Sequence, residues 1–112
     1  MLLVFTHKLD QELDLKGNEV YIDFTQLPDT WGLQYLRISS TKLKSLEGIE
    51  NLRQLRELHA SSNNLHGEIP AALFSLGELR ELHLPFNHFN GTIPSLVYFL
   101  TNLRALYLFV NE

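Results

Sequence analysis

The chain has 112 residues and a formal net charge of −4, with 20% charged and 11% aromatic residues. This length predicts a single domain, the composition is typical of a folded chain, and the acidic balance argues against a nucleic-acid-binding protein. The absence of cysteine excludes disulfide frameworks, thiolate metal sites and cysteine nucleophiles.

The first thirty residues differ from the rest in charge. Residues 1–30 hold six acids and two lysines and therefore carry the whole net charge. Residues 10–20 read DQELDLKGNEV, a weak copy of the repeat, and the alternation of Val20, Ile22 and Phe24 with Tyr21 and Asp23 predicts a strand. We interpret residues 1–30 as an N-terminal cap with a degenerate first repeat, and we expect Trp31 to close the first apolar layer.

The apolar start of the chain is too short for a signal peptide and lacks a basic segment before it. No uninterrupted apolar run approaches the ~18 residues of a membrane span. Together with the missing cysteine, these features predict a cytoplasmic protein that does not associate with membranes.

A repeated pattern occupies the rest of the chain. Residues 33–43 read LQYLRISSTKL, residues 55–65 read LRELHASSNNL, residues 79–89 read LRELHLPFNHF, and a further copy begins at residue 103 as LRALYLFVN. The offsets are 22, 24 and 24 residues. Residues 31–112 are therefore interpreted as tandem repeats, the last of them truncated.

The residues of each copy predict how it folds. In each LxL unit the two apolar side chains point to the same face of a strand, and each copy buries them only against its neighbours. An amide at the ninth position, as in Asn63 and Asn87, satisfies backbone groups in the following turn. Thr41 offers fewer hydrogen bonds there, which predicts a weaker turn. Pro70 and Pro94 predict an extended or 3₁₀ backbone on the opposite side.

These copies resemble the leucine-rich repeat family, whose signature LxxLxLxxNxL stands here as Leu79, Leu82, Leu84, Asn87 and Phe89. Two repeats, with GEIP at 67–70 and GTIP at 91–94, are similar to the GxIPxxLxxL subclass of plant receptor ectodomains. The resemblance implies an α/β solenoid, a short right-handed horseshoe with a parallel concave β-sheet and an extended or 3₁₀ convex side.

The resemblance also implies a function. In this family the concave sheet presents repeat positions 2, 3, 5, 7 and 8 to a partner, so we expect a non-catalytic protein–protein interaction module that is not an enzyme. The alternative is that the residues at these positions have no partner and are solvated strand residues that pair across the sheet. The partner-binding candidates are Tyr35, Arg37, Arg56, Glu57, His59, Arg80, Glu81, His83, Phe86 and Tyr107.

One group of these candidates has metal-binding chemistry. Glu57 and His59 lie two apart on one predicted strand, and Glu81 and His83 take the same places on the next. Neighbouring strands are ~4.8 Å apart, and zinc accepts imidazole and carboxylate ligands. Duplication of one repeat explains the pattern without a metal, and an open sheet encloses no site. We therefore expect no metal and no cofactor.

An alternative interpretation is a fragment of a cell-surface leucine-rich-repeat protein that binds a peptide or glycan outside the cell. Asn90-Gly91-Thr92 is an N-glycosylation sequon. The sequon and the plant-receptor-like repeats favour this alternative, whereas the missing signal peptide and cysteine caps argue against it.

The sequence given ends at the tenth position of a repeat, with no polar closing repeat after it. Solenoids need such caps for solubility, and an uncovered last strand offers unpaired backbone groups. This predicts a homodimer through the C-terminal edge, unless further repeats of a longer protein cover that end. The candidate self-association residues are Leu106, Tyr107, Leu108 and Phe109.

Overall fold

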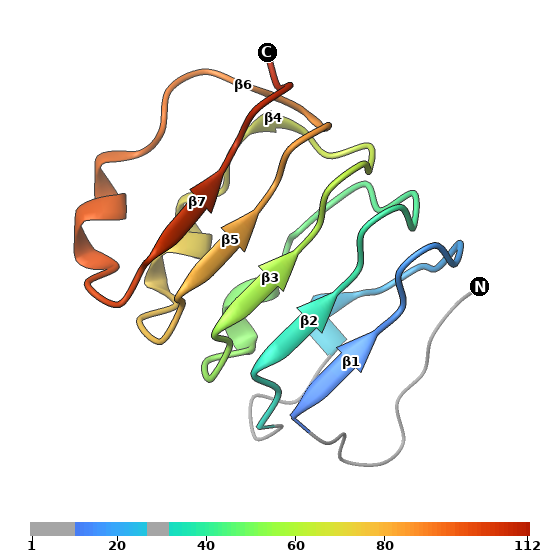
Figure 1. Ribbon diagram of the computed structural model, residues 1–112, viewed down its shortest axis with the longest axis horizontal. Coiled ribbons are helices and arrows are strands. Elements are labelled where there is room, and N and C mark those ends of the chain that lie inside the picture. Colours follow the sequence, from blue (N-terminus) through green and yellow to red (C-terminus); the bar gives the residue numbers. More distant parts are fainter. Residues whose placement is uncertain (1–10, 27–31) are drawn as a thin grey trace.

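The computed structural model describes residues 11–26 and 32–112. Five parallel three-residue strands lie side by side in one sheet, in the order β1-β2-β3-β5-β7 (Figure 1). Their bounds are Glu12–Asp14 (β1), Tyr35–Arg37 (β2), Glu57–His59 (β3), Glu81–His83 (β5) and Ala105–Tyr107 (β7). The predicted repeat solenoid with a parallel sheet is confirmed.

Equivalent residues of successive repeats pair in register across this sheet. Leu36 faces Leu58, Leu58 faces Leu82, and Leu82 faces Leu106. In β2, β3 and β5 the central leucine is buried while its two neighbours are half-buried on the opposite side. Because side chains alternate along a strand, one row of leucines faces the core and two rows face outward.

The opposite side of the solenoid consists of short 3₁₀ turns behind the sheet in Figure 1. These are η1 (Phe24–Gln26), η2 (Ile49–Asn51), η3 (Ala71–Ser75) and η4 (Ser95–Phe99). Pro70 and Pro94 directly precede η3 and η4 with φ of −60° and −57°, as the proline ring requires. The predicted extended or 3₁₀ convex side is confirmed, and no α-helix occurs in residues 11–26 or 32–112.

A second, two-stranded parallel sheet was not predicted from the sequence. It pairs β4 (His66–Glu68) with β6 (His88–Asn90), and His66 lies opposite His88. Both strands follow the ninth-position asparagine of 24-residue repeats, where the chain leaves the first sheet. Equal repeat lengths bring these extended segments into register, so their backbone groups can pair.

Leucine side chains from all the stacked repeats form one continuous core. The five-stranded sheet, the 3₁₀ turns and the segments between them contribute to it. Within the described chain every buried polar side-chain atom has a hydrogen-bond partner. Its fully buried large members are Phe24, Leu33, Leu36, Ile38, Ile49, Leu52, Leu55, Leu58, Leu65, Leu73, Leu76 and Leu79.

Buried asparagines link the turns of adjacent repeats. The Oδ1 atom of Asn63 accepts hydrogen bonds from the backbone N–H groups of Thr41 and Leu43 at 2.9 and 3.0 Å. Its Nδ2 group donates to the carbonyls of Ile38 and Ala60 at 2.8 and 3.1 Å. One side chain thus satisfies four backbone groups in two repeats, which confirms the role predicted for this amide.

The next repeat has the same arrangement. Asn87 accepts from the N–H groups of Asn63 and Leu65 at 3.2 and 3.3 Å, and donates to the carbonyls of Ala60 and Leu84 at 2.9 and 3.1 Å. We call Asn63, Asn87 and Asn111 the asparagine ladder, because Asn111 continues it by accepting from Phe89 N–H at 3.0 Å.

Thr41 takes the equivalent place one repeat before Asn63. Its hydroxyl is fully buried and donates to the Ile38 carbonyl at 2.8 Å. A hydroxyl has one donor hydrogen whereas an amide has two. A weaker turn at Thr41 stays a prediction.

The residue before each ladder position adopts a left-handed backbone conformation. Gly17 has φ of 80°, and Ser40, Ser62, Phe86 and Val110 have φ of 57°, 55°, 57° and 55°. This conformation costs nothing sterically for glycine but disfavours residues with a Cβ. The chain leaves the outer sheet at this point, and the repeats tolerate the strain there because the following asparagine fixes the turn.

The N-terminal segment differs in part from its prediction. Residues 11–20 form a repeat whose strand β1 pairs in register with β2. The strand predicted around Val20 to Phe24 is wrong, because the chain makes a single bridge at Tyr21 and then the turn η1. The alternating burial is present, with Val20 and Phe24 buried and Tyr21 exposed, but Phe24 packs behind the sheet, where Asn51 Nδ2 donates to its carbonyl at 3.2 Å.

The cap assigned to residues 1–30 is only partly covered by the structure. Residues 1–10 and 27–31 lie outside the described residues, and they include Trp31 and the predicted boundary between cap and repeats. That boundary stays a prediction.

The asparagine ladder predicts a specific loss of stability. Asn87→Ala should lower the free energy of unfolding by about 1–3 kcal/mol, because four backbone groups lose their partner inside the protein. Urea denaturation measures this change. Asn102→Ala is the matched control, since Asn102 is exposed and makes one hydrogen bond, to the Gly77 carbonyl at 3.0 Å. Equal effects of the two substitutions would contradict the assigned role of the ladder.

The left-handed backbone at Ser62 predicts that a glycine there stabilises the protein. Ser62→Gly should raise the free energy of unfolding by about 0.5–1 kcal/mol, because removal of the steric cost at φ of 55° outweighs the added freedom of the unfolded chain. Ser61→Gly, at a neighbouring residue without positive φ, should lower it instead. Thermal or urea unfolding of both variants tests this, and a loss of stability in Ser62→Gly would refute the strain argument.

Candidate functional site

The outer face of the five-stranded sheet holds the residues predicted to bind a partner. Seven of them occupy strand positions that flank a buried or half-buried leucine. Arg56 and Arg80 come directly before β3 and β5 and are half-buried, and Phe86 follows β5 and is 50% exposed. The structure therefore places the seven strand candidates on one face of the sheet, with Phe86 lining the same face, although their binding role stays a prediction.

A shallow groove of about 710 Å³ runs across the part of this face where the strands end. It crosses all the repeats, and we call it the concave groove. Five of the candidates line it. The other five lie outside its lining: Tyr35, Arg56, Glu57, Arg80 and Glu81. The residues that line it are Lys16, Arg37, Ser39, Ser40, His59, Ser61, Ser62, His83, Pro85, Phe86, Tyr107 and Phe109.

Rings from three consecutive strands stack along the groove. The ring centroids of His59 and His83 are 4.0 Å apart with an interplanar angle of 14°. Those of His83 and Tyr107 are 4.4 Å apart and tilted by 32°. In-register pairing causes this row, because it places the fifth residue of each repeat directly beside its counterpart.

Charged groups accompany these rings. His59 Nε2 lies 3.2 Å from Glu57 Oε1, and His83 Nε2 lies 3.0 Å from Glu81 Oε1. On the other side of His59, Arg37 forms an ion pair with Glu12 of β1. The acidic start of the chain thus neutralises the arginine at this end of the row.

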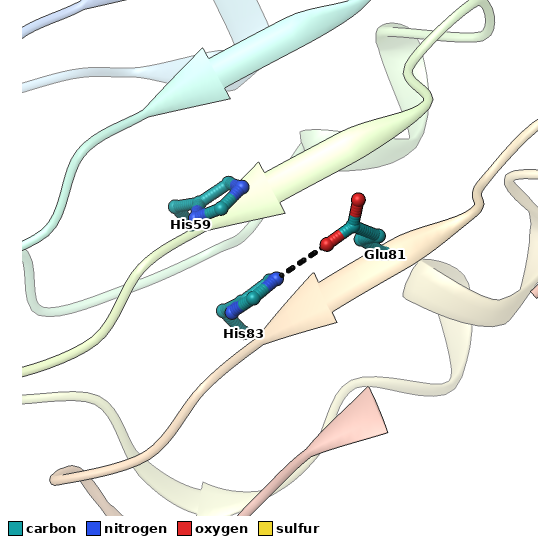
Figure 2. A group of neighbouring side chains, drawn as sticks. All are labelled: His59, Glu81 and His83. Atoms are coloured by element: carbon teal, nitrogen blue, oxygen red, sulfur yellow. Dashed lines mark hydrogen bonds and ion pairs between the residues drawn. The ribbon is translucent and has the colours of Figure 1, made fainter. Parts of the chain in front are cut away.

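Three of these side chains bring metal-ligating atoms together. Figure 2 shows His59 on β3 beside Glu81 and His83 on β5. One donor atom from each lies within 4.8 Å of the other two, and no other group of three or more meets this criterion in residues 11–26 and 32–112. The repeat spacing predicted this proximity, and the same three residues are candidates for partner binding.

The C-terminal end of the groove is apolar. Phe86 and Phe109 meet edge to face, with centroids 5.4 Å apart and an interplanar angle of 85°. Phe109, which the sequence analysis assigned to self-association, therefore lines the concave groove beside Tyr107. Leu106 and Leu108 of the same segment are half-buried and pack against the core.

Two exposed aromatic side chains on the convex side were not singled out from the sequence. Tyr98 and Phe99 of η4 are 85% and 73% exposed. They belong to a 3₁₀ turn without any buried residue, so periodicity gave no signal for them.

In the part of the chain that the structure describes, no helix has the length and apolar character needed to cross a membrane.

Comparisons with known proteins identify relatives of this fold. A family model described as Leucine Rich Repeat matches residues 54–76 and 78–100. An internalin from Listeria monocytogenes is similar, with a TM-score of 0.76, 25% identity and coverage of 91% of this chain and 29% of that chain. No curated protein sequence matches the chain.

Plant receptor kinases are similar as well. The Arabidopsis receptor kinase HAESA, solved with the peptide hormone IDA and the co-receptor SERK1, gives a TM-score of 0.75 at 26% identity over 91% of this chain and 18% of that chain. The ectodomain of GASSHO1/SCHENGEN3 from Arabidopsis thaliana, solved with CASPARIAN STRIP INTEGRITY FACTOR 2, gives 0.73 at 31% identity over 91% and 16%. This chain thus spans less than a third of the length of each of these three proteins.

Proposed function

This chain is a leucine-rich-repeat protein, and we propose that it is a non-catalytic module that binds another protein or a peptide in the concave groove. In the leading form of this proposal the module acts in the cytoplasm.

The observation that carries the proposal is the set of exposed aromatic rings fixed within the groove. Tyr107, Phe86 and Phe109 are 42%, 50% and 56% exposed, yet ring contacts with neighbouring repeats hold each of them in place. Aromatic side chains are enriched among the residues that contribute most to binding, and rings already ordered lose little conformational freedom when a partner binds. A contiguous apolar patch also favours an interaction site over plain solvent exposure.

The charge along the face suits an extended partner. Glu12 and Arg37 form the polar end of the sheet, and Phe86 and Phe109 form the apolar end. A segment lying across the strands would therefore meet a polar surface at one end and a ring pair at the other. The plant receptors similar to this chain were solved with peptide or protein ligands, which supports a ligand of this class.

A second candidate is a piece of a cell-surface recognition protein that binds a peptide or glycan outside the cell. Its support is the similarity to receptor ectodomains and the exposure of Asn90 in β6, where a glycan has access. Expression through a secretory pathway tests one part of it: mass spectrometry should find a glycan on Asn90 that Thr92→Ala removes. An unmodified Asn90 in that material would count against the extracellular candidate.

The main proposal predicts that outward substitutions weaken binding without unfolding the chain. Arg37→Ala, His59→Ala and Tyr107→Ala, at residues that line the concave groove, should each weaken the affinity for a partner recovered from native extract about tenfold, equivalent to about 1.4 kcal/mol. By contrast, Leu82→Ala should lower the free energy of unfolding by ~2–5 kcal/mol, because Leu82 is fully buried. Titration calorimetry and urea denaturation measure the two quantities.

Tyr98→Ala and Phe99→Ala provide the matched control on the convex side, because both residues are highly exposed aromatics. They should leave the affinity unchanged. If they abolish binding while the three substitutions on the outer sheet do not, the partner binds elsewhere and the proposal fails.

Self-association is a separate proposal for the same end of the sheet. β7 is the last strand in the order of the described sheet, and Tyr107 is exposed on it. We expect a dimer in light scattering coupled to size exclusion, and we expect Tyr107→Lys to dissociate it by placing a charge at the contact. Leu106→Lys is less informative, because half-buried Leu106 packs against the core. A monomer at all concentrations, or a dimer unaffected by Tyr107→Lys, refutes the C-terminal contact.

A further inference from the structure

We propose that the concave face binds a divalent transition-metal ion of the Zn²⁺ type through His59 of β3 and through Glu81 and His83 of β5. This site is a function in addition to partner binding. Repeat duplication explains why the residues recur, and the proposal gives them a role as metal ligands.

The donor set suits such an ion. Two imidazoles and one carboxylate are a combination found in zinc sites that keep one coordination position open. Metal–donor bonds of ~2.0–2.2 Å place the donors of a tetrahedral site about 3.3–3.6 Å apart. The donor atoms here lie within 4.8 Å of one another, so movements of about 1.5 Å or less by side chains bring them to a common ion.

The backbone fixes the two histidines next to each other. β3 and β5 pair in parallel register, with His59 opposite His83 and Glu57 opposite Glu81. The imidazoles are nearly parallel, at an angle of 14°, and the ring of Tyr107 packs against His83 from the far side (Figure 2 shows the two histidines). Because an imidazole nitrogen binds a metal in the plane of its ring, at least one of the two rings must rotate out of the stack to share an ion with the other, and in-register pairing keeps the two rings adjacent for this rotation.

The surrounding charges favour a cation. Glu57 Oε1 lies 3.2 Å from His59 Nε2, which places a second carboxylate beside the donor set. The nearest cationic side chain in the row, Arg37, is paired with Glu12, so its repulsion of a metal ion is reduced. Metal-ligating histidines commonly have a carboxylate partner that orients them, and Glu57 can take that role for His59 while Glu81 serves as a ligand.

The site is partly shielded from water. The side chains of His59 and His83 are 26% and 22% exposed, and those of Glu57 and Glu81 are 22% and 37% exposed. An ion held by three protein donors would have one further coordination position to fill. Water or a side chain of a bound partner can fill that position.

A direct test uses ZnCl₂ titrated into the tag-free full chain by isothermal titration calorimetry. We expect one Zn²⁺ per chain, and we expect His59→Gln and His83→Gln each to weaken the affinity at least tenfold. CoCl₂ gives an independent readout, because the visible absorption of tetrahedral Co²⁺ should appear with the wild type and be absent with His83→Gln. Unchanged urea midpoints of the variants, measured without metal, verify that the fold is intact.

The chain itself provides the matched control. His66 of β4 and His88 of β6 also pair in register, but among the described residues they belong to no group of three donors. His66→Gln and His88→Gln should therefore leave the Zn²⁺ affinity unchanged. The proposal is overturned if the wild type binds no Zn²⁺, if His83→Gln binds it as tightly as the wild type, or if His88→Gln weakens binding equally. These measurements need no partner, so their outcome is distinct from that of the partner-binding experiment.

Discussion

The asparagine ladder is the interaction on which the rest of the structure depends. Each tight turn between the outer sheet and the convex side leaves backbone N–H and C=O groups away from water, and Asn63 and Asn87 satisfy them in two repeats at once. Because each side chain spans adjacent repeats, it fixes both the turn and the offset between neighbours. The left-handed residues before the ladder, among them Phe86, show that the chain accepts local strain to keep this geometry.

Fixed register converts a repeated sequence into rows of identical chemistry. The same offset that places Leu58 opposite Leu82 in the core places His59 opposite His83 on the outer face. The pairing register of the strands therefore sets both the leucine row in the core and the histidine row on the surface. A shift of register would move both rows together. The concave groove gains its stacked rings in this way, without a loop or a separate element to position them.

The sequence predicted much of this site because the repeat positions map directly onto sheet positions. Seven of the ten partner-binding candidates flank a strand leucine on the outer face, where period-two alternation puts them, whereas Arg56, Arg80 and Phe86 lie just outside the strands. Phe109 lines the concave groove in addition to its predicted place in self-association, because its ring meets Phe86 at the left-handed turn at residue 86. Alternation also misled at residues 20–24, where apolar side chains pack behind the sheet from a 3₁₀ turn instead of a strand.

By itself, the sequence determined the solenoid, its parallel sheet, the 3₁₀ convex side and the buried role of the asparagines. These follow from the spacing of leucine, asparagine and proline, since periodicity directly encodes which side chains share a face. The second sheet of β4 and β6 and the ring contacts of His59, His83 and Tyr107 became visible only in the folded chain. Those features depend on rotamers and on distances of a few ångströms between separate repeats, which no single repeat specifies.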